Sequence, residues 1–94
     1  MPLPRDVLDR ALLELNGPFQ EAERLSVVSY EPHRFVLRVP PALTLPAEAC
    51  IDERFSAIQY VLHFRDKVTT AIQGAEWQED DHAYHVHYDV VEWD

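Results

Sequence analysis

The stretch from His82 to Trp93 constrains the fold more than any other part of the sequence, because its side chains alternate in character. One set is aromatic or β-branched and would point to one side of a β-strand: Tyr84, Val86, Tyr88 and Val90. The intervening set is polar and would point to the other side: His85, His87 and Asp89. This period of two is typical of a strand with one buried face. The chain must therefore build a sheet and cover one side of it.

The clearest helix signal covers Pro4 to Asn16. Pro4 suits the first turn of a helix, and Gly17-Pro18 is a stop signal. Apolar residues recur between them at helical spacing and form one stripe, made of Leu8, Ala11, Leu12 and Leu15. We expect this stripe to pack on the apolar face of the sheet.

Residues 25–30 and 35–39 are rich in β-branched and aromatic residues and flank the turn sequence E-P-H-R, which predicts a β-hairpin. The segment Pro40 to Pro46 cannot be a central strand, because its prolines lack the donors that a sheet requires. Residues 47–54 are compatible with one or two helical turns.

Residues 55–64, F-S-A-I-Q-Y-V-L-H-F, fit two patterns. A strand would place four residues on one face, Ile58, Tyr60, Leu62 and Phe64, whereas a helix would group Phe55, Ile58 and Leu62. The high β-branched and aromatic content favours the strand. In that case residues 65–67 form a three-residue hairpin loop, and residues 68–78 form the partner strand, with Gly74 as a candidate bulge position.

Together these segments predict a single α+β domain over residues 1–94. Consecutive strands in a small domain usually pair antiparallel. The expected architecture is one antiparallel β-sheet of about five strands, with one N-terminal helix packed on one face.

The charge of the chain is strongly uneven. Residues 1–67 hold ten acidic and eight basic residues, whereas residues 68–94 hold seven acidic residues and no Lys or Arg. Direct nucleic-acid binding and anionic membranes are disfavoured, because both need clustered cations. A basic protein surface is the expected partner. The N-terminal residues do not resemble a signal peptide and no apolar run reaches 18 residues, so we expect a cytoplasmic protein.

An acidic turn at Glu79-Asp80-Asp81 lies close in sequence to aromatic residues. Acidic groups steer a basic partner, and aromatic side chains supply the anchors that interfaces favour. The candidate partner-binding residues are Trp77, Glu79, Asp80, Asp81, Tyr84, Glu92 and Trp93. The alternative is a solvated acidic turn that keeps an aromatic strand soluble.

The row H-x-H-x-D at residues 85–89 is a second candidate site. Two imidazoles at positions i and i+2 of a strand can converge on one divalent transition metal, with a carboxylate as a third ligand. The candidate ligands are His85, His87, Asp89 and His63. The alternatives are the solvated face of an amphipathic strand and a metal-free acid–base site.

Catalytic signatures are absent from the sequence, and the lone Cys50 has no accompanying base or oxyanion motif. The sequence therefore favours a small, acidic, non-enzymatic protein–protein binding module of the inhibitor, antitoxin, immunity or anti-defence type. One alternative is a metal-binding protein or metalloenzyme that uses the H-x-H-x-D row. Another is a homodimer or assembly subunit that pairs through a C-terminal edge strand ending V-V-E-W.

Overall fold

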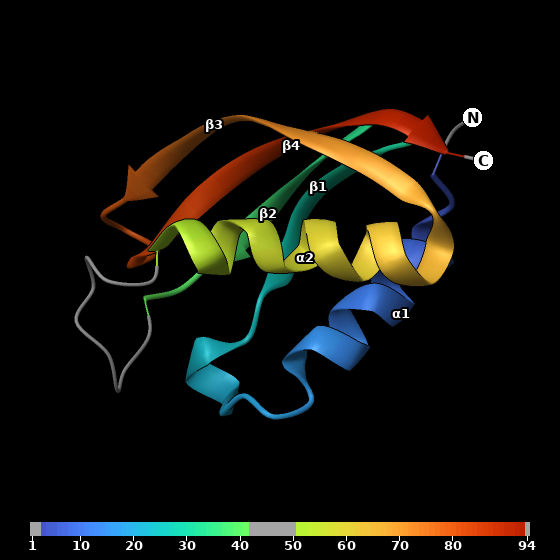
Figure 1. Ribbon diagram of the computed structural model, residues 1–94. Coiled ribbons are helices and arrows are strands. Elements are labelled where there is room, and N and C mark those ends of the chain that lie inside the picture. The colour runs from blue at the N-terminus through green and yellow to red at the C-terminus, as the bar shows by residue number, and fades with distance from the viewer. Residues whose placement is uncertain (1–2, 42–50, 94) are drawn as a thin grey trace.

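The computed structural model describes residues 3–41 and 51–93, with the backbone alone at residues 51–53, 92 and 93. Figure 1 shows the sheet on one side of the molecule and the two α-helices on the other. The described elements are α1 (Arg5–Asn16), the 3₁₀ turn η1 (Glu21–Glu23), β1 (Ser26–Glu31), β2 (Arg34–Val39), α2 (Ile51–Asp66), β3 (Val68–Gln78) and β4 (Ala83–Trp93).

All strand pairs in the sheet are antiparallel, and the strand order is β1-β2-β4-β3. The last strand of the chain therefore lies inside the sheet, paired with β2 on one side and with β3 on the other. Both helices cover the same face, so the sheet has one covered face and one helix-free face (Figure 1). The predicted α+β class with an antiparallel sheet and an N-terminal helix on one face is confirmed.

The core lies between the helices and the apolar face of β2 and β4. The predicted alternation in β4 is confirmed, because Val86 and Tyr88 are fully buried and their polar neighbours point to the helix-free face. Tyr88 stacks on Phe35 of β2 with 5.0 Å between ring centroids, and its hydroxyl donates to the Phe55 carbonyl of α2 at 2.5 Å. Burial raises the pKa of Tyr88 well above its ordinary value, so this hydroxyl stays a neutral donor.

Residues 55–64 are not a strand but the main part of helix α2, so the strand prediction is wrong. Ile58 and Leu62, four residues apart, are both fully buried, whereas Tyr60 and Phe64 are 64% and 69% exposed. A strand would have put all four side chains on one face. The helix is favoured because its one stripe completes the cover of the sheet, which outweighs the β propensity of the individual residues.

This change also corrects the strand count and the pairing. The described chain has four strands and two α-helices instead of about five strands and one helix. Residues 65 and 66 are the last residues of α2, so the expected three-residue loop is reduced to Lys67, which adopts the left-handed region at φ 59°, and β3 pairs with β4 rather than with residues 55–64. The bulge expected near Gly74 is confirmed, since the β3–β4 register shifts between Ile72 and Gly74.

The remaining connections follow from local hydrogen bonds. Asn16 at the end of α1 exchanges two hydrogen bonds with the backbone of Leu25, at 2.8 and 2.9 Å, and so fixes the entry to β1. Residues 19–24, between α1 and β1, contain the short 3₁₀ turn η1. Residues 42–46 of the predicted Pro40–Pro46 loop and residues 47–50 of the predicted helical turns lie outside the described residues, whereas residues 51–54 are the first turn of α2. Among the described helices, none is long and apolar enough to cross a membrane.

A pair of alanine substitutions tests the α2 assignment. Leu62→Ala should lower the free energy of unfolding by about 2–5 kcal/mol, because it empties a fully buried site. Phe64→Ala, measured in dilute solution, should change it by less than about 0.5 kcal/mol, because the ring is exposed. Denaturant unfolding measures both values. Similar losses for the two variants would indicate a shared face and contradict the helix.

Candidate functional site

Strands β3 and β4 form a long hairpin whose turn projects at the left end of the sheet in Figure 1. The turn is closed by backbone hydrogen bonds from Asp81 to the Gln78 carbonyl and from His82 to the Glu79 carbonyl, at 3.2 and 3.3 Å. His82 adopts φ 50°, the left-handed conformation that reverses the chain. We refer to the side chains of Trp77, Glu79, Asp80, His82 and Tyr84 as the hairpin tip.

Trp77 is the aromatic centre of the hairpin tip. Its ring lies edge-on to Tyr84 at 5.0 Å and to His82 at 5.2 Å, and Tyr84 in turn packs edge-on against Phe55 of α2 at 5.3 Å. The indole Nε1 donates to Glu79 Oε2 at 2.7 Å, while 39% of the residue remains exposed. Trp77 is therefore held in one orientation from several sides and still offers a surface to a partner.

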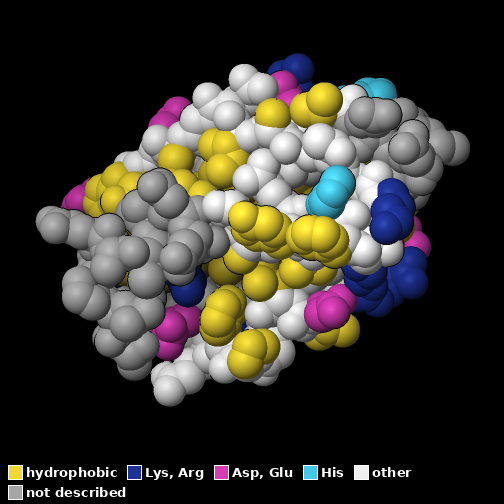
Figure 2. All heavy atoms as spheres, viewed as in Figure 1, with side chains coloured by type: hydrophobic (Ala, Val, Ile, Leu, Met, Phe, Trp, Pro, Cys, Tyr) yellow, Lys and Arg dark blue, Asp and Glu magenta, His cyan; other side chains and the backbone are white. Residues whose placement is uncertain are grey.

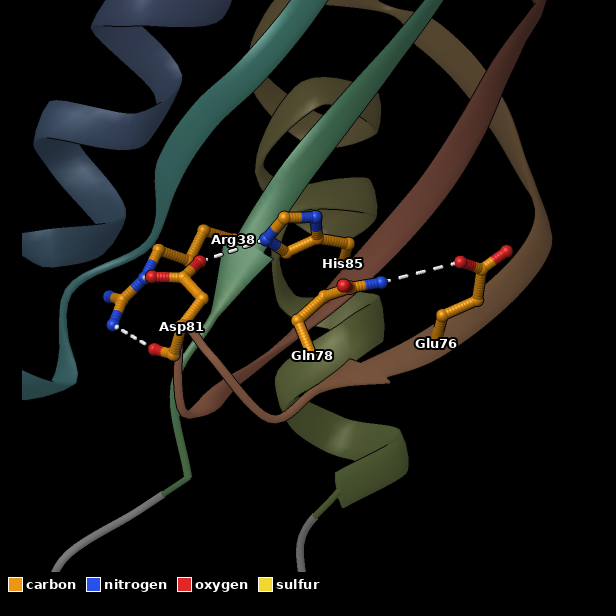
Figure 3. Close-up of polar contacts among 5 residues, drawn as sticks. All are labelled: Arg38, Glu76, Gln78, Asp81 and His85. Atoms are coloured by element: carbon orange, nitrogen blue, oxygen red, sulfur yellow. Dashed lines mark hydrogen bonds and ion pairs between the residues drawn. The ribbon is translucent and has the colours of Figure 1, made fainter.

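The Asp81 side chain points toward Arg38 and His85 (Figure 3). Arg38 of β2 donates from Nε to Asp81 Oδ1 at 2.8 Å and from Nη2 to the Asp81 backbone carbonyl at 2.9 Å. His85 Nε2 lies 2.8 Å from Asp81 Oδ2. These contacts, His85 first and Arg38 second, hold the pKa of Asp81 below its ordinary value.

The Asp81 contacts anchor the hairpin tip to the centre of the sheet. Both carboxylate oxygens are engaged, so Asp81 positions the tip rather than presenting a free charge. Sequence reasoning did not identify Arg38 as part of the site. The two residues are 43 positions apart, and no local pattern relates them.

The H-x-H-x-D row lies on the helix-free face, but its members have separate neighbours. His85 contacts Asp81, and His87 Nε2 lies 3.9 Å from Glu76 Oε1. Asp89 lies across from Arg34 of β2 in the strand register. His63 is on α2, which packs on the opposite face of the sheet, so the structure does not bring it to His85 and His87.

The helix-free face is hollowed beside this row. The hollow has a volume of about 640 Å³ and a broad mouth, and residues from all four strands line it. Its lining mixes acidic residues with Arg34 and does not converge on one point. Among the described residues, no group of three or more His, Cys, Asp or Glu side chains could hold a metal ion.

The predicted partner-binding residues fall into two regions. Trp77, Glu79, Asp80 and Tyr84 meet at the hairpin tip. The backbone of Glu92 and Trp93 lies at the other end of β4, about 30 Å away at the usual rise of a strand, beside the start of β3. These two residues therefore do not belong to the same patch, and their side chains are outside the described part of the chain.

The hairpin tip thus combines one exposed indole with two exposed carboxylates, on a turn fixed by the Arg38–Asp81–His85 contacts. Such a surface can bind cationic side chains through charge and through the aromatic face. No protein-family model, curated protein or solved structure matches this chain.

The anchoring role of Asp81 predicts a specific pH dependence. Asp81→Asn should lower the thermal midpoint by several degrees near neutral pH, because it weakens the contacts with His85 and Arg38. Since the folded pKa of Asp81 lies below its ordinary value of 3.8, its ionised form stabilises the fold above that pH. The difference between parent and variant should therefore shrink as the pH falls below about 4.

The matched control for this experiment is Asp80→Asn, which changes the neighbouring exposed carboxylate. It should leave the thermal midpoint nearly unchanged at every pH. Thermal melts from pH 7 down to about pH 2.5 cover the transition. Equal effects of the two variants would show that Asp81 is not an anchor.

Proposed function

We propose that this protein is a small, non-enzymatic protein-binding module that presents its hairpin tip to a basic surface of another protein. Modules of the inhibitor, antitoxin, immunity and anti-defence types act in this way, by occluding a functional surface of the partner. The observation that carries the proposal is the exposed Trp77 beside the exposed carboxylates of Glu79, which accepts from the Trp77 indole, and Asp80.

The charge of the hairpin tip is available to a partner. Residues 68–94 contain no Lys or Arg, and no described cation lies within ion-pair distance of Glu79 or Asp80. Figure 2 shows most of the visible Lys and Arg side chains at the right of the view, away from the end where the β3–β4 turn lies in Figure 1, with others at the top and at the left. This separation of charge orients the molecule as it approaches a basic surface and accelerates association.

The hairpin tip is also preorganised. Glu79 is tied to the Trp77 indole, and the turn is fastened to β2 through Asp81 and Arg38. A tip that is already fixed loses little conformational entropy when it binds. Aromatic anchors with such support are the residues that carry most of the binding energy in protein interfaces.

The partner surface is expected to be a compact basic recess. The exposed carboxylates of Glu79 and Asp80 lie at one end of the hairpin, whereas Asp89 lies well along β4. This spacing suits insertion of the tip into a cationic cleft, such as one that binds nucleic-acid phosphates. The carboxylates are not spaced along an extended line, as mimicry of a nucleic-acid phosphate backbone would require.

Charge removal tests the steering role of the hairpin tip. The partner is isolated by affinity capture with the parent chain, and its binding rates are measured over a range of salt concentrations. The double variant Glu79→Gln/Asp80→Asn should associate roughly three- to tenfold more slowly at low salt, with a flatter salt dependence. The matched control is Asp6→Asn/Asp9→Asn, which removes two exposed carboxylates from α1. Equal slowing by the two double variants would contradict steering by the tip.

Truncation of the aromatic anchor tests the contact itself. Trp77→Ala should increase the dissociation rate of the captured partner by about tenfold or more, because it removes a supported aromatic anchor. Leu13→Ala, which truncates an exposed apolar residue on α1, serves as the control and should leave the rate unchanged. A partner that leaves both variants at the parental rate binds elsewhere, and this result would overturn the proposal.

A further inference from the structure

Strand β3 is an edge of the sheet that lacks the usual protection. It pairs with β4 on one side, and no described strand lies on its other side. Residues 68–75 contain no charged residue and no proline, the residues that normally prevent an edge strand from pairing with another chain. The extra residue of the bulge on β3 is Gln73, and a second register shift, between Thr69 and Thr70, has its extra residue, Val91, on β4.

The opposite edge is protected in the expected manner. Strand β1 has six residues, carries a bulge at Val28 and ends in the charged Glu31. A strand this short, ending in a charged residue, is a poor template for a second chain. The two edges therefore differ, and β3 is the one suited to pairing.

Helix α2 presents an exposed aromatic pair beside β3. Tyr60 and Phe64 are 64% and 69% exposed, and their rings stack in parallel, 6.1 Å apart and at 3° to each other. Figure 2 shows a hydrophobic patch across the middle of the face that contains α2 in Figure 1. The pair is separated from the strand by a groove of about 210 Å³ that is lined by Gln59, Tyr60, His63, Phe64, Thr69 and Thr70.

Charges along β3 run from basic to acidic. Arg65 (which pairs with Glu14), Asp66 and Lys67 lie just before the strand and give that end a net positive charge from Lys67, whereas Glu76 and the hairpin tip lie at its other end. An antiparallel partner with the same sequence meets this gradient in reverse. In a pairing centred on Thr70, Lys67 of one copy lies about three residues, or roughly 10 Å, from Glu76 of the other along the strands, which is about one Debye length.

We propose that two copies of this chain associate as an antiparallel two-fold dimer through β3, centred near Thr70. The two sheets join into one continuous sheet, and the Tyr60–Phe64 pairs of the two copies meet beneath the junction and cover each other. The exposed face of α2 is therefore covered by a second copy of the chain. This surface is separate from the hairpin tip and does not depend on the function proposed for it.

Each copy carries a net charge of −9, which opposes self-association. The geometry of this dimer reduces that repulsion, because it keeps the acidic hairpin tips of the two copies far apart. Because the two β3 strands are antiparallel about a two-fold axis at Thr70, the two hairpin tips point in opposite directions. Each tip is nine or ten residues from the axis, so the tips lie about 60 Å apart, well beyond the range of screened repulsion. At the axis itself the strands are uncharged.

One hydrogen bond in the single chain sets a limit on the strength of association. Gln59 Nε2 donates to the Thr70 carbonyl at 2.9 Å, at the centre of the proposed junction. A backbone N–H from the second copy competes with this amide, so pairing there replaces a hydrogen bond rather than adding one. We therefore expect a weak dimer, with a Kd of roughly 10–100 µM.

The sequence analysis expected the C-terminal strand to be an edge strand through which two copies could pair, but β4 is an interior strand of the described sheet. Strand β4 is paired with β2 as far as Asp89, and the Val90 amide donates to the His33 carbonyl at 2.8 Å. The interior position of β4 leaves β3 as the edge on that side of the sheet.

Sedimentation velocity over a concentration series tests the dimer. The parent chain should convert from monomer to dimer with rising concentration. Tyr60→Lys/Phe64→Lys should raise the Kd at least about tenfold, because it replaces the facing aromatic pairs with like charges. The control Leu13→Lys/Val28→Lys makes the same change in charge at exposed apolar positions elsewhere, and it should dimerise as the parent does.

Circular dichroism checks that each variant is folded. If the aromatic double variant is not, Thr69→Lys provides the test instead, because it places like charges beside the axis at an exposed strand position. A parent chain that stays monomeric up to about 1 mM overturns the proposal. A folded variant that dimerises as well as the parent also overturns it.

Amide hydrogen exchange locates the junction independently of the variants. Exchange at Val68–Ile72 should slow as the parent concentration rises through the Kd, whereas exchange in β1 should not change. Slowing in β1 instead of β3 would contradict the proposed edge. A negative result in either experiment leaves the role of the hairpin tip intact, because the tip variants are scored by binding to a different protein.

Discussion

The buried ring of Tyr88 is the point on which the structure depends, because it joins three elements that are distant in sequence. The ring stacks on Phe35 of β2, and its hydroxyl donates to the Phe55 carbonyl of α2. Ile58 and Leu62 of α2 complete the same core. Contacts of this kind require α2 to be a helix, since only a helix brings its 3.6-residue stripe onto the sheet while leaving the intervening aromatic residues in solvent.

The alternation within β4 gives the two faces of the strand different roles, one in the core and the other in holding the hairpin tip. One face of the strand supplies Val86 and Tyr88 to the core, and the other supplies His85 to the contacts that hold Asp81. Arg38 takes the corresponding position on β2, so the helix-free face is where the hairpin tip is fastened to the sheet. Within the histidine row, His85 is the member that helps to position the turn.

The two proposed surfaces use opposite ends of the same hairpin. At the turn, charge and an indole suit a basic partner, and at the start of β3 an uncharged edge beside Tyr60 and Phe64 suits a second copy. A dimer joined at β3 would carry two hairpin tips facing away from each other. Such an arrangement could engage two copies of a partner and gain avidity without any new contact at the tip.

The sequence by itself determined the α+β class, the N-terminal helix, the first hairpin and the two faces of β4, because periodicity of apolar residues is local and strong there. Only the tertiary structure decided residues 55–64, where Ile58 and Leu62 fit either period and the need to cover the sheet settled the choice. Likewise, no sequence pattern joins Arg38 to Asp81 or separates Trp77 from Trp93, since pairing across 43 residues and the length of a strand are properties of the folded sheet.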